Sequence, residues 1–183
     1  LDAGLPMAPQ QASWRAVEVP ALTDGMADYY ITDIQMLHED EGWALAGTNL
    51  MHFVEGSWSI GPIDLSNSAR TIAMVSPDSG WLSGSDGELL RFSGGAWHHT
   101  ENPLSGPIDV IHMQSPTSGW AADATGGLAE LSGATWTRRD SPTSQPIYDI
   151  DMVSSSSGWA VGEGGAVLRY DGESWRLAET LGD

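Results

Sequence analysis

A Gly-Trp pair recurs four times in this chain at almost constant spacing. The tryptophans of these pairs are 38, 39 and 39 residues apart, and a second tryptophan follows each after 15 or 16 residues. Self-similarity at a period of about 40 residues is typical of repeat architectures. We therefore expect an array of similar units, marked by Gly42-Trp43, Gly80-Trp81, Gly119-Trp120 and Gly158-Trp159 and by Trp58, Trp97, Trp136 and Trp175.

Each unit reads as four short strands. A run rich in β-branched residues precedes every Gly-Trp pair, with Ile and Met in the same register each time. A bend rich in Gly, Asp and Ser follows the pair, and then an alternating run such as "ELLRFSG" or "AVLRYDG" leads to the second tryptophan. Alternating runs separated by such bends predict β-hairpins. The Ile and Met residues in register are Ile34 and Met36, Ile72 and Met74, Ile111 and Met113, and Ile150 and Met152.

A single four-stranded unit cannot bury both of its faces, whereas units stacked side by side can. The predicted fold is therefore all-β, a β-propeller-type repeat of four-stranded blades, with a solenoid of β-hairpins as the competing architecture. We expect one domain over residues 1–183, with repeats at about 31–60, 69–100, 107–139 and 146–178. The tryptophans in register are expected to pack between blades, because each buries about 150–250 Å².

The N-terminus resembles half of a repeat. "GLPMAPQQASWRAVEV" aligns without a gap on "GAVLRYDGESWRLAET", which places Trp14 on Trp175 and predicts a half repeat at 1–19. Three arrangements are compatible with this half repeat. It could cap the array as an extra edge strand, it could complete a sheet in a second copy of the chain, or the chain could be part of a longer propeller.

The runs "SGWAVGEGGAVLRYDGESW", "SGWLSGSDGELLRFSGGAW" and "EGWALAGTNLMHFVEGSW" resemble the repeats of propellers related to photosystem II assembly factors. They also resemble the Asp-box repeats of bacterial neuraminidases and other secreted propellers. The Asp of the Asp box is present only as Asp171, and Val54, Ser93 and Ser132 occupy the matching positions. The resemblance implies a propeller and, for the assembly-factor group, a non-enzymatic docking role. It implies no site residue here.

Charge and composition exclude several classes of protein. The chain has 25 acidic residues against seven Arg and no Lys, so its formal net charge is −18. Such a chain would be repelled by nucleic acid and by anionic membrane surfaces. No run of 18 apolar residues occurs, so membrane insertion is not expected. The chain has no Cys and opens with Leu1, as after removal of a signal peptide, and we expect an extracytoplasmic location.

Few residues suggest chemistry. Four acids fall on or near the first strand of their repeats, where a propeller has its central channel, namely Asp33, Asp109, Asp149 and Asp151. We expect them to line that channel. Arg138-Arg139 is the only basic doublet and is a candidate contact for a partner. No catalytic group, metal site or cofactor site is expected. The adjacent His98 and His99 would point to opposite faces of a strand, which disfavours their binding one metal ion together.

The sequence therefore favours a non-enzymatic, extracytoplasmic scaffold module that docks onto or builds a larger protein assembly. Its expected partners are proteins, and further copies of itself through the half repeat are one candidate. The alternative is a carbohydrate-binding or glycoside-hydrolysing secreted domain with an Asp-box-like fold. Aromatic residues outside the repeat register would support that alternative, and they are Tyr29, Tyr30 and Tyr148.

Overall fold

The computed structural model describes residues 16–17, 19, 30–61, 63 and 65–178. Within them the chain is all β, apart from one 3-10 turn at Glu163–Gly165. Sixteen strands form four antiparallel sheets of four strands each. The predicted all-β array of four-stranded repeats is therefore confirmed.

Each sheet is one repeat, and we call the sheets blades 1 to 4 in chain order. Blade 1 contains β1 (Ile31–His38), β2 (Glu41–Ala46), β3 (Asn49–Val54) and β4 (Ser57–Gly61). Blade 2 contains β5 (Ala69–Ser76), β6 (Ser79–Gly84), β7 (Leu89–Ser93) and β8 (Ala96–Thr100). Blade 3 contains β9 (Ile108–Ser115), β10 (Ser118–Asp123), β11 (Leu128–Ser132) and β12 (Thr135–Arg139). Blade 4 contains β13 (Ile147–Ser154), β14 (Ser157–Gly162), β15 (Val167–Tyr170) and β16 (Trp175–Leu177).

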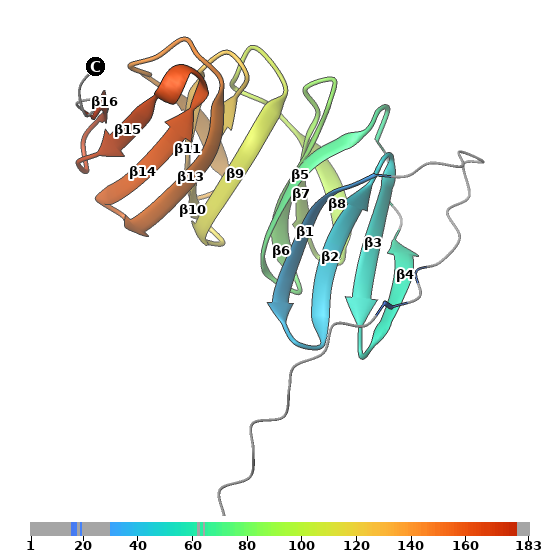
Figure 1. Ribbon diagram of the computed structural model, residues 1–183. Coiled ribbons are helices and arrows are strands. Elements are labelled where there is room, and N and C mark those ends of the chain that lie inside the picture. The colour runs from blue at the N-terminus through green and yellow to red at the C-terminus, as the bar shows by residue number, and fades with distance from the viewer. Residues whose placement is uncertain (1–15, 18, 20–29, 62, 64, 179–183) are drawn as a thin grey trace, which may run out of the picture.

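The blades follow one another face to face, with blades 1 and 4 at opposite ends of the row (Figure 1). Within a blade the strands are hydrogen-bonded in chain order, so every connection is a hairpin. The first strands of successive blades contact one another, β1 with β5, β5 with β9 and β9 with β13. These four strands are therefore the innermost strands of the array.

The turn between the first and second strands is closed by the same kind of hydrogen bond in every blade. The residue that ends each innermost strand accepts a hydrogen bond from the backbone N–H two residues later, which closes the turn before the second strand. The acceptors are His38 Nδ1, Ser76 Oγ, Ser115 Oγ and Ser154 Oγ, at 3.3 to 3.4 Å.

The bend after β10 is held by a buried carboxylate. Asp123 Oδ1 accepts hydrogen bonds from Thr125 N at 2.8 Å, from Thr125 Oγ1 at 2.7 Å and from Gly127 N at 2.8 Å. Asp123 itself is fully buried. This one side chain therefore fixes the connection between the two central strands of blade 3.

Each Gly-Trp pair needs glycine because a methionine side chain of the adjacent strand occupies the space that a Cβ would take. Gly80 lies directly opposite Met74 in the neighbouring strand, and a Cβ on Gly80 would clash with the sulfur of Met74 and lie 3.1 Å from the Ala73 carbonyl. The same close approach occurs at Gly42, Gly119 and Gly158, each beneath the methionine of its own blade. The Ile and Met positions and the Gly-Trp pair are therefore parts of one packing motif.

Three of the four core clusters lie at the junctions between successive blades, and the fourth lies within blade 1, where Trp58 packs against Ala44, Ala46 and Met51. At the first junction Trp43, Leu45 and Leu50 of blade 1 pack against Ile72, Met74, Leu82 and Leu90 of blade 2. Equivalent residues fill the junctions between blades 2 and 3 and between blades 3 and 4. At each of these three junctions, the earlier blade contributes its Gly-Trp tryptophan and the later blade contributes its Ile and Met.

The predicted half repeat at 1–19, including Trp14, lies outside the described residues except for Ala16, Val17 and Val19. Its three proposed arrangements stay predictions. The boundaries of the four blades differ from those of the predicted repeats by at most one residue.

Candidate functional site

The tryptophans in register differ sharply in exposure. Trp43, Trp81 and Trp120 are 0 to 3% exposed, whereas Trp159 at the same register position in blade 4 is 42% exposed. The first three lie at junctions, and Trp159 lies on the face of blade 4 that points away from blade 3. Of the second tryptophans, Trp136 and Trp175 are buried, and Trp58 and Trp97 are half-buried.

Two of the three junctions are closed by aromatic contacts between blades. Trp81 meets Trp136 edge to face, with ring centroids 5.4 Å apart and an interplanar angle of 80°. Trp120 meets Trp175 at 5.3 Å and 87° and also contacts Tyr170 at 5.0 Å. Edge-to-face geometry is the preferred arrangement of aromatic rings, so these contacts stabilise the second and third junctions.

The outer face of blade 4 carries side chains of the kind found at the junctions. Among the described residues, however, no blade packs against this face. Trp159, Val161 and Val167 share this face, because Trp159 is opposite Arg169 and Val161 is opposite Val167 in the sheet register. All three are exposed. The Arg169 guanidinium lies 5.4 Å from the centre of the Trp159 ring. We call this surface the blade-4 face.

The acid Asp33 is a junction residue. Its Oδ2 accepts hydrogen bonds from the backbone N–H of Ile72 at 2.9 Å and from Thr71 Oγ1 at 3.1 Å, both on β5 of the next blade. Its Oδ1 accepts from the N–H of Ile34, the next residue in its own strand, at 2.9 Å. Asp33 lies on an innermost strand, as expected, and it also joins blade 1 to blade 2.

Two further residues join blades at one register position, immediately before the repeat methionine. The amide of Gln35 donates to the Met74 carbonyl at 2.8 Å and accepts from the Met74 N–H at 2.7 Å. In blade 3 the same position is His112, whose Nε2 accepts from the Met152 N–H at 3.4 Å. Both are opposite the Gly-Trp tryptophan of their blade. These roles were not predicted from the sequence, although Gln35 and His112 occupy the same position when the repeats are aligned.

Asp149 and Asp151 occupy these junction positions in blade 4. Asp149 is opposite Val161 as Asp33 is opposite Leu45, and Asp151 is opposite Trp159 as Gln35 is opposite Trp43. Asp149 Oδ1 accepts from the Ile150 N–H at 2.9 Å, the same local bond that Asp33 makes. Both acids are exposed. The blade-4 face therefore has hydrogen-bond acceptors as well as apolar side chains where the other blades join.

The innermost strands also border a polar hollow of about 490 Å³. Arg70 of blade 2 and Asp109 of blade 3 form an ion pair there, across the second junction. Thr32, Asp33, His112 and Tyr148 are further lining residues. Asp109 is thus bound to a neighbouring blade, and of the four predicted acids Asp33, Asp109 and Asp149 line this hollow.

The doublet Arg138-Arg139 is bound within the chain. Arg139 forms an ion pair with Glu130 on the adjacent strand, with its Nη2 2.6 Å from Oε2 and its Nε 2.8 Å from the same oxygen. Arg138 Nη1 donates to Ser105 Oγ at 3.0 Å. The doublet is on the surface at the end of β12, and both guanidinium groups have partners.

The described residues contain no group of three or more His, Cys, Asp or Glu that could hold a metal ion. Among them we also find no helix with the length and apolar character needed to cross a membrane.

Asp171 is the one aspartate at the Asp-box position. Its Oδ1 accepts hydrogen bonds from Ser174 N at 2.9 Å and from Glu173 N at 3.1 Å, so it closes the turn between β15 and β16. These two backbone N–H donors hold the pKa of Asp171 below its ordinary value, and the hydrogen bond from Ser174 has the larger effect. Its side chain is also 3.0 Å from Arg176. The structure thus gives Asp171 the role of a turn residue.

Solved structures of β-propellers resemble this chain in fold. YCF48, a photosystem II assembly factor, aligns in a structure of YCF48 bound to D1 peptide with a TM-score of 0.63 and 22% identity, over 87% of this chain and 57% of that one. YCF48 from Cyanidioschyzon merolae aligns with a TM-score of 0.65 and 20% identity, over 81% and 53%. The WD40 β-propeller domain of Doa1 aligns with a TM-score of 0.62 and 12% identity, over 75% and 49%.

These comparisons confirm the propeller-type fold and, at the level of fold, the resemblance to the photosystem II assembly-factor propellers. The chain spans about half the length of the YCF48 chains it matches. It matches no protein-family model and no curated protein sequence.

Proposed function

We propose that this chain is a non-enzymatic interaction module that builds a larger protein assembly through the blade-4 face. The observation that carries the proposal is the exposure of Trp159, at a register position that is buried at every junction of the described blades. Large exposed apolar side chains that share one face mark interaction surfaces.

The blade-4 face has both parts of a junction. Trp159, Val161 and Val167 supply the apolar contact that Trp43, Leu45 and Leu50 supply in blade 1. Asp149 and Asp151 supply the acceptors that Asp33 and Gln35 supply there. A surface with this combination fits a sheet that presents backbone N–H groups and apolar side chains together.

The partner we propose is the innermost strand of blade 1 in a second copy of the chain, at its outward-facing Ile34 and Met36; Ala44, Ala46 and Met51 on the same face are buried. Blade 1 exposes Ile34 and Met36 at 57% and 44%, whereas the equivalent Ile72 and Met74 of blade 2 are almost fully buried against blade 1. Joining unlike faces gives a head-to-tail contact, which produces closed rings or open filaments. One of the similar structures is YCF48 bound to D1 peptide, which supports a protein as partner.

The non-enzymatic character and the location belong to the proposal. Asp33 and Asp109, two of the acids considered for chemistry, already bind neighbouring blades, which favours a structural use. A location outside the cytoplasm rests on the resemblance to the repeats of secreted propellers. Cell fractionation with an antibody to the chain tests the location directly.

The test of assembly is sedimentation velocity of the purified chain from low to high micromolar concentration. We expect the wild type to form larger species as its concentration rises. Trp159→Glu should stay monomeric, because a carboxylate would be buried without a partner in the contact.

The matched control is Leu177→Glu, since Leu177 is also exposed but shares its face with Leu168 on the other side of blade 4. This variant should associate as the wild type does. A wild type that is monomeric throughout, or a Trp159→Glu variant that associates normally, contradicts the proposal.

A further inference from the structure

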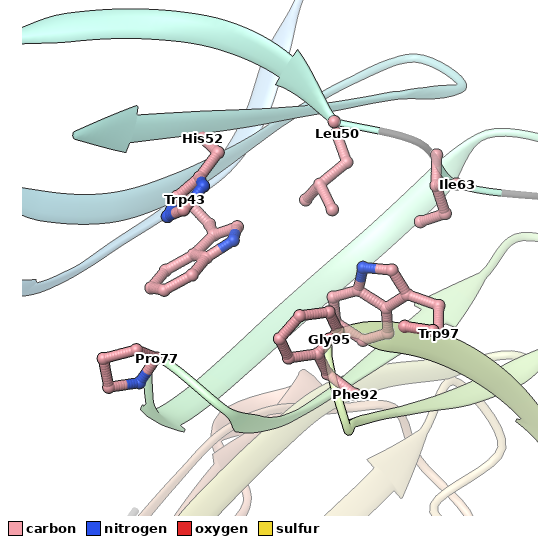
Figure 2. Close-up of a pocket in the computed structure, with 10 residues that line it drawn as sticks. Trp43, Leu50, His52, Ile63, Pro77, Phe92, Gly95 and Trp97 are labelled. Atoms are coloured by element: carbon pink, nitrogen blue, oxygen red, sulfur yellow. The ribbon is translucent and has the colours of Figure 1, made fainter.

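An apolar pocket of about 550 Å³ lies at the first junction, between blades 1 and 2. Figure 2 shows Trp43 and His52 on one side of it, Phe92 and Trp97 on the other, and Leu50 and Ile63 above. Pro77 lies at its lower edge in this view. The walls are thus aromatic and aliphatic, and the volume is in the range of small-molecule sites, about 300–1,000 Å³.

The pocket exists because the first junction lacks the aromatic contact that closes the other two. In those junctions the tryptophan of the fourth strand meets the Gly-Trp tryptophan of the preceding blade edge to face. At the first junction the corresponding residues are Trp97 and Trp43, and among the described rings no contact joins them. Trp97 instead packs on Phe92 at 5.1 Å, within its own blade.

Two residues of blade 1 account for the open space. His52 is stacked on Trp43, with ring centroids 4.3 Å apart and an interplanar angle of 14°. Gly61 lies opposite Leu50, at a register position that carries Thr100 in blade 2 and Arg139 in blade 3. Because Gly61 has no side chain, the space beside Leu50 is left unfilled.

We propose that this pocket binds a small, uncharged aromatic molecule of one or two rings. Such a ring would take the place that the tryptophan of the fourth strand takes at the other junctions, between Trp43 and Trp97, and would gain the same edge-to-face contacts. An anionic ligand is disfavoured by charge. Glu41 lies 3.3 Å from His52 at the wall of the pocket, and the chain as a whole has a net charge of −18. The proposal is independent of the blade-4 face.

Binding can be tested by NMR titration of the tryptophan indole N–H signals with indole. We expect the signals of Trp43 and Trp97 to shift saturably, with a dissociation constant on the order of 0.1–1 mM for so small a ligand. Trp136 and Trp175, which lie at the closed junctions, should not shift. Phenol should bind more tightly than cyclohexanol, which has the same number of heavy atoms but no aromatic ring.

A blocking variant keeps the test independent of folding. A Cβ at Gly61 would lie 3.7 Å from Leu50, an ordinary contact, and the φ of Gly61 is not in the left-handed region, so the backbone at this position accepts a side chain without strain, and Gly61→Leu is the variant to use. It should weaken indole binding about tenfold or more, equal to at least about 1.4 kcal/mol. Thr100→Leu adds bulk at the equivalent position of the next junction and should leave binding unchanged.

Three results would each overturn the inference. The first is the absence of saturable shifts in the wild type at millimolar indole. The second is a Gly61→Leu variant that binds indole as the wild type does. The third is equal affinity for cyclohexanol and phenol, which would show that the pocket is apolar but does not prefer aromatic rings.

Discussion

Trp81 and Trp159 occupy the same position in their repeats, and replacing each by alanine should have very different effects. Both follow a glycine, and both have an arginine over the ring, Arg91 at 5.7 Å and Arg169 at 5.4 Å. They differ in that blade 3 packs against Trp81, while no described blade packs against Trp159. The pair of substitutions therefore isolates the contribution of a neighbouring blade.

The magnitude follows from burial. Trp81 is fully buried and meets Trp136 edge to face, so Trp81→Ala leaves a large cavity and should cost about 3–5 kcal/mol of unfolding free energy. Trp159 is 42% exposed, and the contact of its ring with Arg169 is worth about 0.5–1 kcal/mol at an exposed site. We expect Trp159→Ala to cost about 1 kcal/mol or less, a difference between the variants of about 3 kcal/mol.

Urea denaturation followed by circular dichroism measures both losses. The protein should be dilute enough to be monomeric, because association through the blade-4 face would add stability that depends on concentration. Trp81→Phe is a useful intermediate, since it retains an aromatic ring in the junction and should cost less than Trp81→Ala. Equal losses for Trp81→Ala and Trp159→Ala in the monomer would refute the assignment of Trp159 to a face without a neighbouring blade.

Three further predictions concern single turns and strands. Gly80→Ala should lower the unfolding free energy by about 1–3 kcal/mol in urea denaturation, because the new Cβ clashes with Met74; an unchanged midpoint would refute the packing motif. Asp123→Ala leaves the N–H groups of Thr125 and Gly127 without their acceptor and should cost about 3 kcal/mol in the same assay, and Asp123→Asn should cost less because one oxygen remains. For Asp171 the pKa is lowered in the folded chain, so its contribution is present above the unfolded-state pKa and is lost as the pH falls through the folded-state pKa. Melting temperatures of the wild type and Asp171→Asn should therefore differ at neutral pH and converge on acidification, and a constant difference would contradict that role.

The fold was predictable because its determinants are local and repeated. The spacing of Trp43, Trp81 and Trp120 fixes the length of a repeat, and the bends between alternating runs fix four strands per repeat. The structural reason for the Gly-Trp pair was not predictable in the same way. It lies in the methionine that covers the glycine from the adjacent strand, and that contact needs the strand register.

The candidate surfaces were harder to predict, because each depends on what lies beyond its own repeat. Trp159 reads like Trp81 in the sequence, and only the position of blade 4 at the end of the row exposes it. Asp33 was predicted as a channel acid, yet its role is set by the Ile72 N–H in another blade. The pocket at the first junction arises from an absence, the missing side chain of Gly61, which no motif signals.

The junctions between blades are bridged by different chemical groups. The first is bridged by the carboxylate of Asp33 and the amide of Gln35, the second by the ion pair of Arg70 and Asp109, and the third by the imidazole of His112. Blades that look alike are consequently not interchangeable. Duplication of a whole repeat would place each new tryptophan correctly. The innermost strand of the new repeat would still have to acquire residues that match its neighbours at each junction. Recombinants that transpose two repeats should therefore keep their secondary structure and lose cooperativity.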